Sequence, residues 1–313
     1  MADIMENLVC RNITKQYEKG KYALRNVNLS IPSKGIFALI GRNGAGKTTL
    51  VRILATQLAL TSGSACIDGI DVTDNPKDIR EMIASVPQDG RAVGWLTPRQ
   101  MIKSYLMWRG FSGSEANSRA EVSLKEVGVY KYIDTLNRLL SGGTRRKVLV
   151  AMVMASEAKI LFLDEPTTGL DPISRSELWR ILVQMKKDRF IFLTTHYLEE
   201  AETLADKIGV LEDGKLMALG TLSELRSMVK YPYSIKILSD IRAPHPRNGK
   251  VIKGIDRHYQ IVTTEKEAYT LTKKLIAKGV KFSMNPLTLD DIFYYIVKKP
   301  IEGENYENEE ERD

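Results

Sequence analysis

A glycine-rich segment centred on residue 45 carries the residue types that bind phosphate groups. It follows the apolar run 36–40 and precedes a helix-patterned stretch, the context in which a match to G-x-x-x-x-G-K-[ST] is significant. Glycines let backbone N–H groups surround phosphates, Lys47 would reach the β and γ phosphates, and the Thr48 hydroxyl would ligate Mg²⁺. A glycine-rich turn that merely precedes a helix is the alternative. We expect the whole segment to bind phosphate: Gly41, Arg42, Asn43, Gly44, Ala45, Gly46, Lys47, Thr48 and Thr49.

A pair of acidic residues follows a second apolar run. Residues 160–163 read ILFL, which indicates a strand buried on both faces, and Asp164 and Glu165 come directly after it. Ligands of open α/β sheets bind at the carboxyl ends of the strands. Asp164 could therefore hold Mg²⁺ opposite Thr48, and Glu165 could act as a base on an attacking water. An acidic pair that only caps the turn at Pro166 is the alternative.

A second possible anion site lies at residues 140–144, which read LSGGT and open another helix-patterned stretch. The Ser141 hydroxyl and the exposed N–H groups of a helix start can bind an anion, and three bases follow at 145–147. A helix cap made of a polar residue and glycines is the alternative. One chain thus offers two phosphate-binding loops but one set of magnesium ligands.

Strand-like and helix-like segments alternate around these residues. Short apolar runs indicate strands, at 36–40, 160–163, 190–194 and 207–211, and the region 8–31 indicates two strands around a turn. Alternation of this kind predicts an α/β fold with a parallel sheet. Residues 89–157 interrupt it with a helical region, in which Thr97 and Pro98 are a helix start.

The sequence pattern changes after about Gly220, where proline-containing breaks occur at 231–233 and 243–246. Short strand candidates lie at 233–238, 250–253, 258–263 and 280–284, and helix candidates lie at 266–277 and 289–298. We expect an α/β domain at 1–225, a small α+β domain at 226–300 and a disordered acidic tail at 301–313.

Composition excludes several classes of protein. With 43% hydrophobic and 27% charged residues, the 313-residue chain is neither globally disordered nor collagen-like. Cys10 and Cys66 are too few for a disulfide framework, and three histidines argue against a histidine-based metal centre. No stretch reaches the roughly 20 apolar residues of a membrane span, so we expect no transmembrane segment in this chain.

The positive charge lies mainly toward the C-terminal part. The net charge of +7 includes a net −6 on residues 302–313, so the rest of the chain carries +13. Residues 222–301 hold 15 bases and 7 acids, whereas residues 1–221 carry only +5. This charge invites a nucleic-acid or anionic-membrane partner. Because no zinc spacing or RNP-like aromatic motif accompanies it, we expect no nucleic acid as a partner.

The ordered motifs resemble those of ATP-binding-cassette (ABC) ATPases, the nucleotide-binding subunits of ABC transporters. The resemblance covers residues 8 to about 221 and adds four elements to the three segments above: the aromatic Tyr17, the glutamine-loop residue Gln88, the D-loop residue Asp171 and the switch residue His196. Thr144 departs from the pattern, since the family's signature usually ends in Gln. Tyr22 is a weaker candidate than Tyr17, which follows the family's K-x-Y pattern.

The resemblance implies a P-loop NTPase core with a helical subdomain at 89–157, which uses ATP and Mg²⁺ and closes as a head-to-tail homodimer or heterodimer. Tyr17 would stack on adenine, Gln88 would sense Mg²⁺, and Glu165 would act on the water. His196 would bind the γ-phosphate. The partner's ATP would meet this chain's signature and D-loop, residues Ser141, Gly142, Gly143 and Asp171.

A C-terminal segment, 285–293, resembles the P-[ST]-L-E-D-[VI]-F element of ABC-2, drug- and polysaccharide-exporter subunits, with Asp290 in place of Glu. The resemblance therefore implies export through separate integral-membrane permease subunits, at the cytoplasmic face of the cell membrane. Permease contact is expected beside the glutamine loop, at Trp95, Leu96, Tyr105 and Trp108. Packing within the helical region is the alternative for Tyr105 and Trp108. A soluble ABC ATPase of assembly, repair or translation is the alternative.

Overall fold

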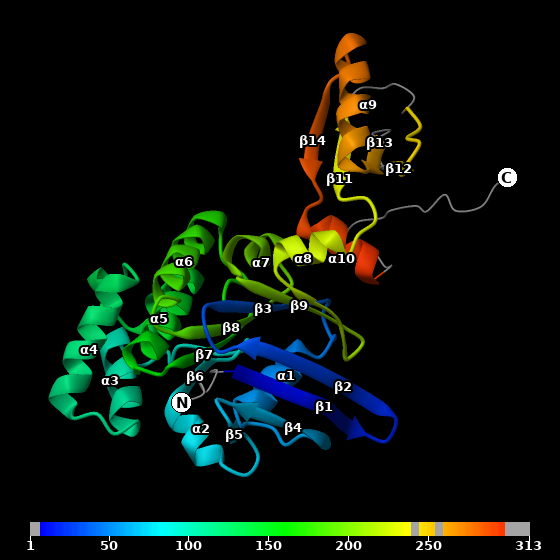
Figure 1. The fold of residues 1–313 in the computed structure, drawn as a ribbon. Coiled ribbons are helices and arrows are strands. Elements are labelled where there is room, and N and C mark those ends of the chain that lie inside the picture. The colour runs from blue at the N-terminus through cyan, green and yellow to red at the C-terminus, as the bar shows by residue number, and fades with distance from the viewer. Residues whose placement is uncertain (1–6, 239–243, 254–258, 298–313) are drawn as a thin grey trace, which may run out of the picture. The chain divides into compact units, whose positions relative to one another are not determined.

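The computed structural model describes residues 7–238, 244–253 and 259–297 (Figure 1). The chain divides into two compact units, Met1–Leu216 and Met217–Asp313, and each is considered by itself. The acidic tail that we predict at 301–313 lies outside the described residues.

A six-stranded sheet forms the centre of the first unit, in the order β10-β9-β3-β8-β7-β6. Its pairs β3·β8, β3·β9, β7·β8 and β6·β7 are parallel, which confirms the predicted α/β fold. Every residue of β3, β7 and β8 is buried, as expected for strands covered on both faces. The strands are β3 (Ile36–Ile40), β6 (Ile83–Val86), β7 (Ile160–Asp164), β8 (Phe190–Thr195), β9 (Lys207–Glu212) and β10 (Lys215–Gly220).

A second, antiparallel sheet has the order β2-β1-β4-β5. It consists of β1 (Asn7–Glu18), β2 (Lys21–Pro32), β4 (Ser62–Ile67) and β5 (Ile70–Asp71). Helix α1 (Lys47–Leu54) lies between the two sheets, where it contacts β2 and β7 (Figure 1). It ends earlier than the helical stretch to about Leu60 that the sequence indicates. Thr56 has a φ of +57°, and the N–H groups of Gln57 and Leu58 turn back to the Arg52 carbonyl.

Helices cover the other face of the parallel sheet (Figure 1). Helix α5 (Gly142–Ala155) contacts β6, α7 (Leu198–Leu204) contacts β3 and β8, and α6 (Pro172–Met185) packs between α5 and α7. The predicted helical region contains α3 (Pro98–Trp108) and α4 (Gly113–Glu126), which pack on each other and on α5. Thr97 caps α3 in a reciprocal capping box with Gln100. Short helices complete the unit: α2 (Pro76–Met82), η1 (Tyr130–Tyr132) and η2 (Asn137–Leu139).

The second unit contains an antiparallel sheet of order β12-β13-β11-β14. This order, with α9 joining β13 to β14 across β11, is that of a ferredoxin-like split β-α-β arrangement. Strand β14 begins two residues later than the strand we predict at 280–284. The elements are α8 (Leu222–Ser227), β11 (Tyr233–Ile237), β12 (Gly249–Lys253), β13 (Tyr259–Thr263), α9 (Glu265–Ala277), β14 (Phe282–Pro286) and α10 (Leu289–Val297).

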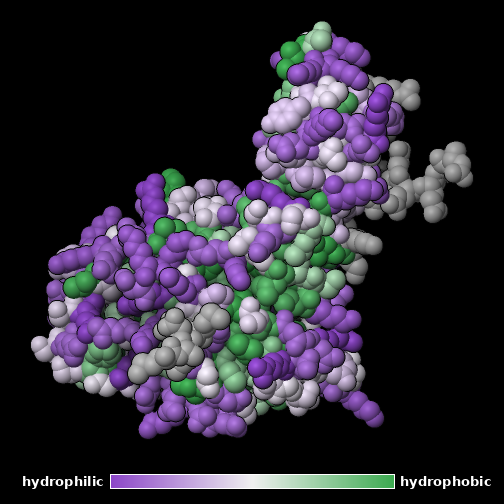
Figure 2. Space-filling model, viewed as in Figure 1, coloured by the Kyte–Doolittle hydropathy of each residue, from purple (hydrophilic) through white to green (hydrophobic). Residues whose placement is uncertain are grey.

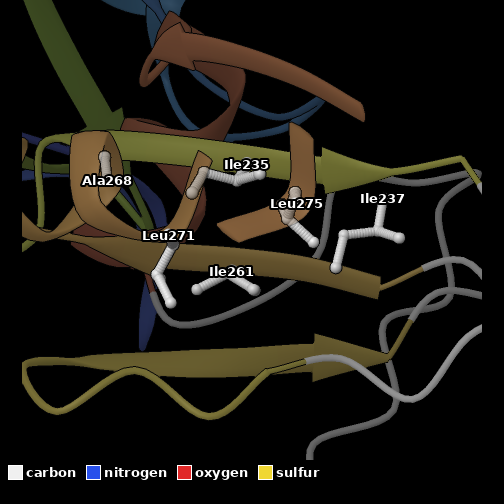
Figure 3. Close-up of a cluster of buried hydrophobic side chains, with 6 residues drawn as sticks. All are labelled: Ile235, Ile237, Ile261, Ala268, Leu271 and Leu275. Carbon is white, nitrogen blue, oxygen red and sulfur yellow. The ribbon is translucent and has the colours of Figure 1, made fainter. Parts of the chain in front are cut away.

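One face of this sheet packs against α9. Figure 3 shows Ala268, Leu271 and Leu275 of the helix beside Ile235 and Ile237 of β11, and Ile261 of β13 joins the same buried cluster. Burial of such apolar side chains is the main stabilising contribution to a unit of this size. Its outer surface is mostly hydrophilic in the view of Figure 2. Among the helices of the described residues, none is long and apolar enough to cross a membrane.

Candidate nucleotide site

The topology gathers the predicted site residues at one edge of the parallel sheet. The neighbouring strands β3, β8, β7 and β6 run in the same direction, so their carboxyl ends share an edge. The glycine-rich loop follows β3, His196 follows β8, Asp164 ends β7, and Gln88 comes shortly after β6. Four segments that are far apart in the sequence therefore meet at one place.

The glycine-rich loop requires its glycines for steric reasons. Gly44 and Gly46 have φ angles of +81° and +107°, a region that favours glycine. A Cβ atom at Gly41 would lie 2.2 Å from the Leu211 carbonyl oxygen, and one at Gly46 would lie 2.4 Å from the Ala23 carbonyl oxygen. Gly46 is also the N-cap of α1 and supplies no side-chain cap, so the helix start is left open to an anion.

Lys47 points into this loop. Its side chain is buried, and Nζ donates hydrogen bonds to the carbonyls of Gly41 (2.7 Å) and Arg42 (3.1 Å). Nζ also lies 3.7 Å from Glu165 Oε1. Burial lowers the pKa of Lys47, while the carboxylates of Glu165 and Asp164 act in the opposite direction. Phosphate oxygens would be stronger partners for this ammonium group than neutral carbonyls.

The Glu165 carboxylate is the meeting point of the site. It is buried, and Oε2 accepts hydrogen bonds from Gln88 Nε2 (3.2 Å) and Thr168 Oγ1 (3.0 Å). His196 Nδ1 lies 3.1 Å from the same oxygen. This contact does not count as a hydrogen bond, and Nδ1 has no hydrogen-bond partner among the described residues. Lys47, Gln88 and His196, which are predicted from separate motifs, thus surround one predicted carboxylate. The contribution of Thr168 is not evident from the sequence motifs.

Asp164 is buried one residue earlier and accepts a hydrogen bond from the Thr194 hydroxyl of β8. The expected magnesium ligands, Thr48, Gln88 and Asp164, offer hydroxyl, amide and carboxylate oxygens, which are the donors that Mg²⁺ prefers. No group of three His, Cys, Asp or Glu side chains that could hold a metal occurs in the described residues. Mg²⁺ commonly binds through one or two carboxylates, waters and substrate phosphates, so this donor set fits it.

Tyr17 lies near the same helix. Its ring is 57% exposed, and its hydroxyl is 3.3 Å from Thr49 Oγ1 in α1. An exposed aromatic face next to the phosphate loop suits stacking on a base. Each of the two tyrosines has a cation over its ring: Lys15 Nζ lies 5.4 Å from the Tyr17 ring centroid, and the Arg25 guanidinium lies 4.9 Å from that of Tyr22.

The signature residues lie at the start of α5. Ser141 is the N-cap of α5 and accepts a hydrogen bond from the Thr144 N–H (3.2 Å), while the two hydroxyls lie 2.9 Å apart. Gly143 packs toward Ser174 and Leu170. Ser141 and Gly142 are exposed, and Gly142 lines the same cavity as Gln88 and Thr168.

Asp171 belongs to the signature side. It caps α6 by accepting hydrogen bonds from the N–H groups of Ile173 and Ser174, both at 3.0 Å, and from the Ser174 hydroxyl at 2.7 Å. The bonds from Ser174 lower the pKa of Asp171. The carboxylate therefore stays ionised beside the signature.

Arg146 is a site residue that motif reasoning misses. Its side chain is 8% exposed, and its guanidinium donates hydrogen bonds to four backbone carbonyls. One acceptor is Pro87, directly before Gln88, and the other three are the acidic pair and the residue after it: Asp164, Glu165 and Pro166. The sequence shows only a run of bases at this point, and no spacing rule singles out the buried one.

Comparison with known proteins shows the family of this chain. Residues 24–168 match the family described as ABC transporter. Over 316 residues the chain is 31% identical to ABC transporter A family member 7 of Arabidopsis thaliana, with 93% of this chain and 34% of that protein covered. The chain carries an ABC transporter ATP-binding domain.

Other A-family transporters are similar to this ABC chain. It is 30% identical over 269 residues to phospholipid-transporting ATPase ABCA3 of Homo sapiens, covering 85% of this chain and 16% of that protein. The chain thus spans about a third or less of the length of these curated relatives.

Solved ABC cassettes share the fold. An ATP-binding subunit of an ABC transporter matches with a TM-score of 0.64 and 27% identity, covering 71% of this chain and 92% of that one. The dimeric cassette MJ0796, bound to ADP and Pi, matches with a TM-score of 0.63 and 28% identity, covering 69% of this chain and 98% of that one. The first unit is therefore an ABC-type ATPase fold.

Proposed function

We propose that this chain binds and hydrolyses ATP to drive an ABC transporter. The observation that carries the proposal is the convergence of Lys47, Gln88 and His196 on the buried Glu165 carboxylate, next to a glycine loop with an open helix start. Each group comes from a different strand end, so their meeting is unexpected for unrelated turns and caps. The A-family relatives favour transport over a soluble ABC ATPase of assembly, repair or translation.

The residues then divide the chemistry among them. The glycine loop and Lys47 bind the β and γ phosphates, Tyr17 stacks on adenine, and His196 contacts the γ-phosphate. Thr48, Asp164 and Gln88 would hold Mg²⁺, which would neutralise charge on the phosphates. Glu165 accepts a hydrogen bond from the attacking water and removes its proton.

A second copy, or a related cassette, completes each site. Ser141, Gly142 and Gly143 present the exposed start of α5, and Asp171 lies on the same side through Ser174. An ATP held by the first group of residues on one chain would contact the second group on its partner. The dimeric state of the similar cassette MJ0796 supports this arrangement.

The proposal also covers the membrane partners of this chain and the place where it acts. We assign integral-membrane permease subunits as partners, with the chain at the cytoplasmic face of the membrane and with export as the direction. The segment 285–293, which resembles exporter subunits, supports the ABC-2-like branch. Trp95 and Trp108 are 77% and 82% exposed and are available to a partner, whereas Leu96 and Tyr105 are partly buried. Exposed aromatic residues are favoured anchors at interfaces.

Replacing Glu165 by Gln tests the central assignment. The amide keeps the size of the side chain but cannot accept the water's proton, so we expect ATP binding and dimer formation with hydrolysis reduced by about 100-fold or more. Phosphate release and ATP-dependent size-exclusion chromatography measure the two effects. The matched control is Glu199→Gln, an exposed acid on α7, which should hydrolyse ATP normally. Normal turnover in Glu165→Gln would contradict the assignment.

A further inference from the structure

We infer that Arg146 is a positioning residue that holds the backbone of the hydrolytic loop and of the glutamine loop against the signature helix α5. The inference rests on the proposed ATP hydrolysis and adds a residue outside the P-loop, Gln88, the carboxylates and His196. The geometry of Glu165 would then depend on a side chain that extends from the signature helix and binds the backbone on both sides of the carboxylate.

The contacts of the guanidinium carry this inference. Nη2 donates to the carbonyls of Asp164 (3.0 Å) and Glu165 (2.9 Å), and Nε donates to that of Pro166 (2.9 Å). Nη1 donates to the carbonyl of Pro87 at 3.3 Å, directly before Gln88. One planar group thus joins three consecutive residues, Asp164 to Pro166, to Pro87, which lies 59 positions before Arg146 in the sequence. An ammonium group has no planar fork of donors to reproduce this pattern.

The backbone of Glu165 shows why such support is needed. Its φ is +48°, in the left-handed region that non-glycine residues adopt at a cost in free energy. The Glu165 N–H donates to both the carbonyl and the hydroxyl oxygen of Thr194, each at 3.1 Å. Arg146 binds the carbonyl on the other side. The unfavourable conformation that aims the carboxylate at Lys47 and Gln88 is therefore held from β8 and from α5.

The charge of Arg146 also acts on the site. Burial lowers the pKa of Arg146, and the carboxylates of Asp164, Glu165 and Glu200 oppose that effect, so the group stays charged. Removing it would leave buried carbonyls without a donor, and Lys47 would have to balance the charge of the buried Asp164 and Glu165 carboxylates without the guanidinium. A substitution here should therefore disturb hydrolysis more than it disturbs the glycine loop, because the four carbonyls that Arg146 binds lie outside that loop.

Arg146→Lys is the first test, because it keeps the charge and removes the fork of donors. We expect kcat to fall by about 10- to 100-fold through displacement of the carboxylate, while the dissociation constant for ATP changes by less than about two-fold. Hydrolysis and binding of a fluorescent ATP analogue give the two numbers. Arg180→Lys, at an exposed arginine of α6, is the control and should change neither.

Arg146→Ala with added guanidinium separates positioning from a general loss of structure. A cavity of about 330 Å³ lies against Arg146 and Gln88, so a guanidinium ion can enter the space that the substitution opens. Millimolar guanidinium chloride should restore at least several-fold of the lost rate in Arg146→Ala and none in Arg180→Ala.

Either of two results overturns the inference. One is a wild-type kcat in folded Arg146→Lys. The other is an equal loss of ATP affinity and of turnover in both Arg146 variants, without rescue by guanidinium. The proposed function is judged separately: normal turnover in Glu165→Gln would remove it, whatever Arg146 does.

Discussion

The chain contains two glycine-rich helix starts that are built in opposite ways. Helix α1 begins at Gly46, in a left-handed conformation and without a side-chain cap, and Lys47 is buried behind it. Helix α5 begins at Ser141, whose backbone is extended and whose hydroxyl caps the Thr144 N–H. Ser141 is exposed, whereas a side chain at Gly46 would collide with Ala23 and Leu24.

This difference shows how a similar composition serves two tasks. At α1 the surrounding protein imposes the loop shape, and a ligand must supply the missing cap. At α5 the chain supplies its own cap and remains accessible to another molecule. The first helix start suits phosphate binding within one chain, and the second suits contact with the ATP that a partner chain holds. Substitutions at the two starts should therefore have different consequences.

The largest effect is expected for Gly46→Ala. The new Cβ would lie 2.4 Å from the Ala23 carbonyl oxygen at a φ of +107°, so the loop must move. We expect ATP affinity to fall by about 100-fold, which corresponds to about 3 kcal/mol. Binding of a fluorescent ATP analogue measures it.

The comparison for that variant is Gly142→Ala at the second start, where no atom lies within 4 Å of the added Cβ. Gly142→Ala should fold and bind ATP to the single chain with normal affinity. Equal affinities for the two alanine variants would mean that the two helix starts do not differ as described.

An intermediate effect is expected for Ser141→Ala. Loss of the α5 cap should lower the free energy of unfolding by about 1 kcal/mol. Loss of the hydroxyl from the partner's ATP should reduce hydrolysis by about 10-fold, roughly the strength of one hydrogen bond to a charged group. Thermal unfolding and phosphate release report the two parts. If Ser141→Ala loses stability but hydrolyses ATP normally, then Ser141 only caps α5 and does not contact the partner's ATP.

The smallest effect is expected at Thr144, which stands where the family usually has Gln. Its hydroxyl is 2.9 Å from that of Ser141 and can orient it. Thr144→Val should reduce hydrolysis by up to about five-fold, in keeping with about 1 kcal/mol for a neutral hydrogen bond. Thr144→Ser keeps the hydroxyl and should retain the rate. An unchanged rate in Thr144→Val would assign no role to this contact in orienting Ser141.

The sequence predicts the parts of the site that depend on local spacing. The phosphate loop, the acidic pair at a strand end and the cap at Ser141 each combine neighbouring residues, so periodicity and turn chemistry reveal them. The strands β3 and β9 were likewise predicted closely, because their apolar runs are unbroken. Strands β6 and β10 were missed, since a four-residue strand and a partly exposed edge strand lack such a run.

What the sequence could not predict depends on contacts between distant segments. Arg146 reaches Pro87 across 59 residues, and Thr194 reaches Glu165 across 29. In each contact one of the two partners is a backbone atom, the Pro87 carbonyl or the Glu165 N–H. Because every residue has a backbone carbonyl and nearly every one an N–H, the residue types do not reveal such contacts. The positive φ of Glu165 is hidden in the same way, because glutamate is not a residue that signals it.

Arg146 lies on the same helix as Ser141, five residues further along. A helix transmits displacement almost as a rigid rod, so a shift at its first turn is carried to the guanidinium. In a head-to-tail pair, Ser141 would touch one ATP while Arg146 holds the loop that cleaves the other. The nucleotide at one site would thereby affect the position of the hydrolytic loop at the other site, and hydrolysis at the two sites would be coupled.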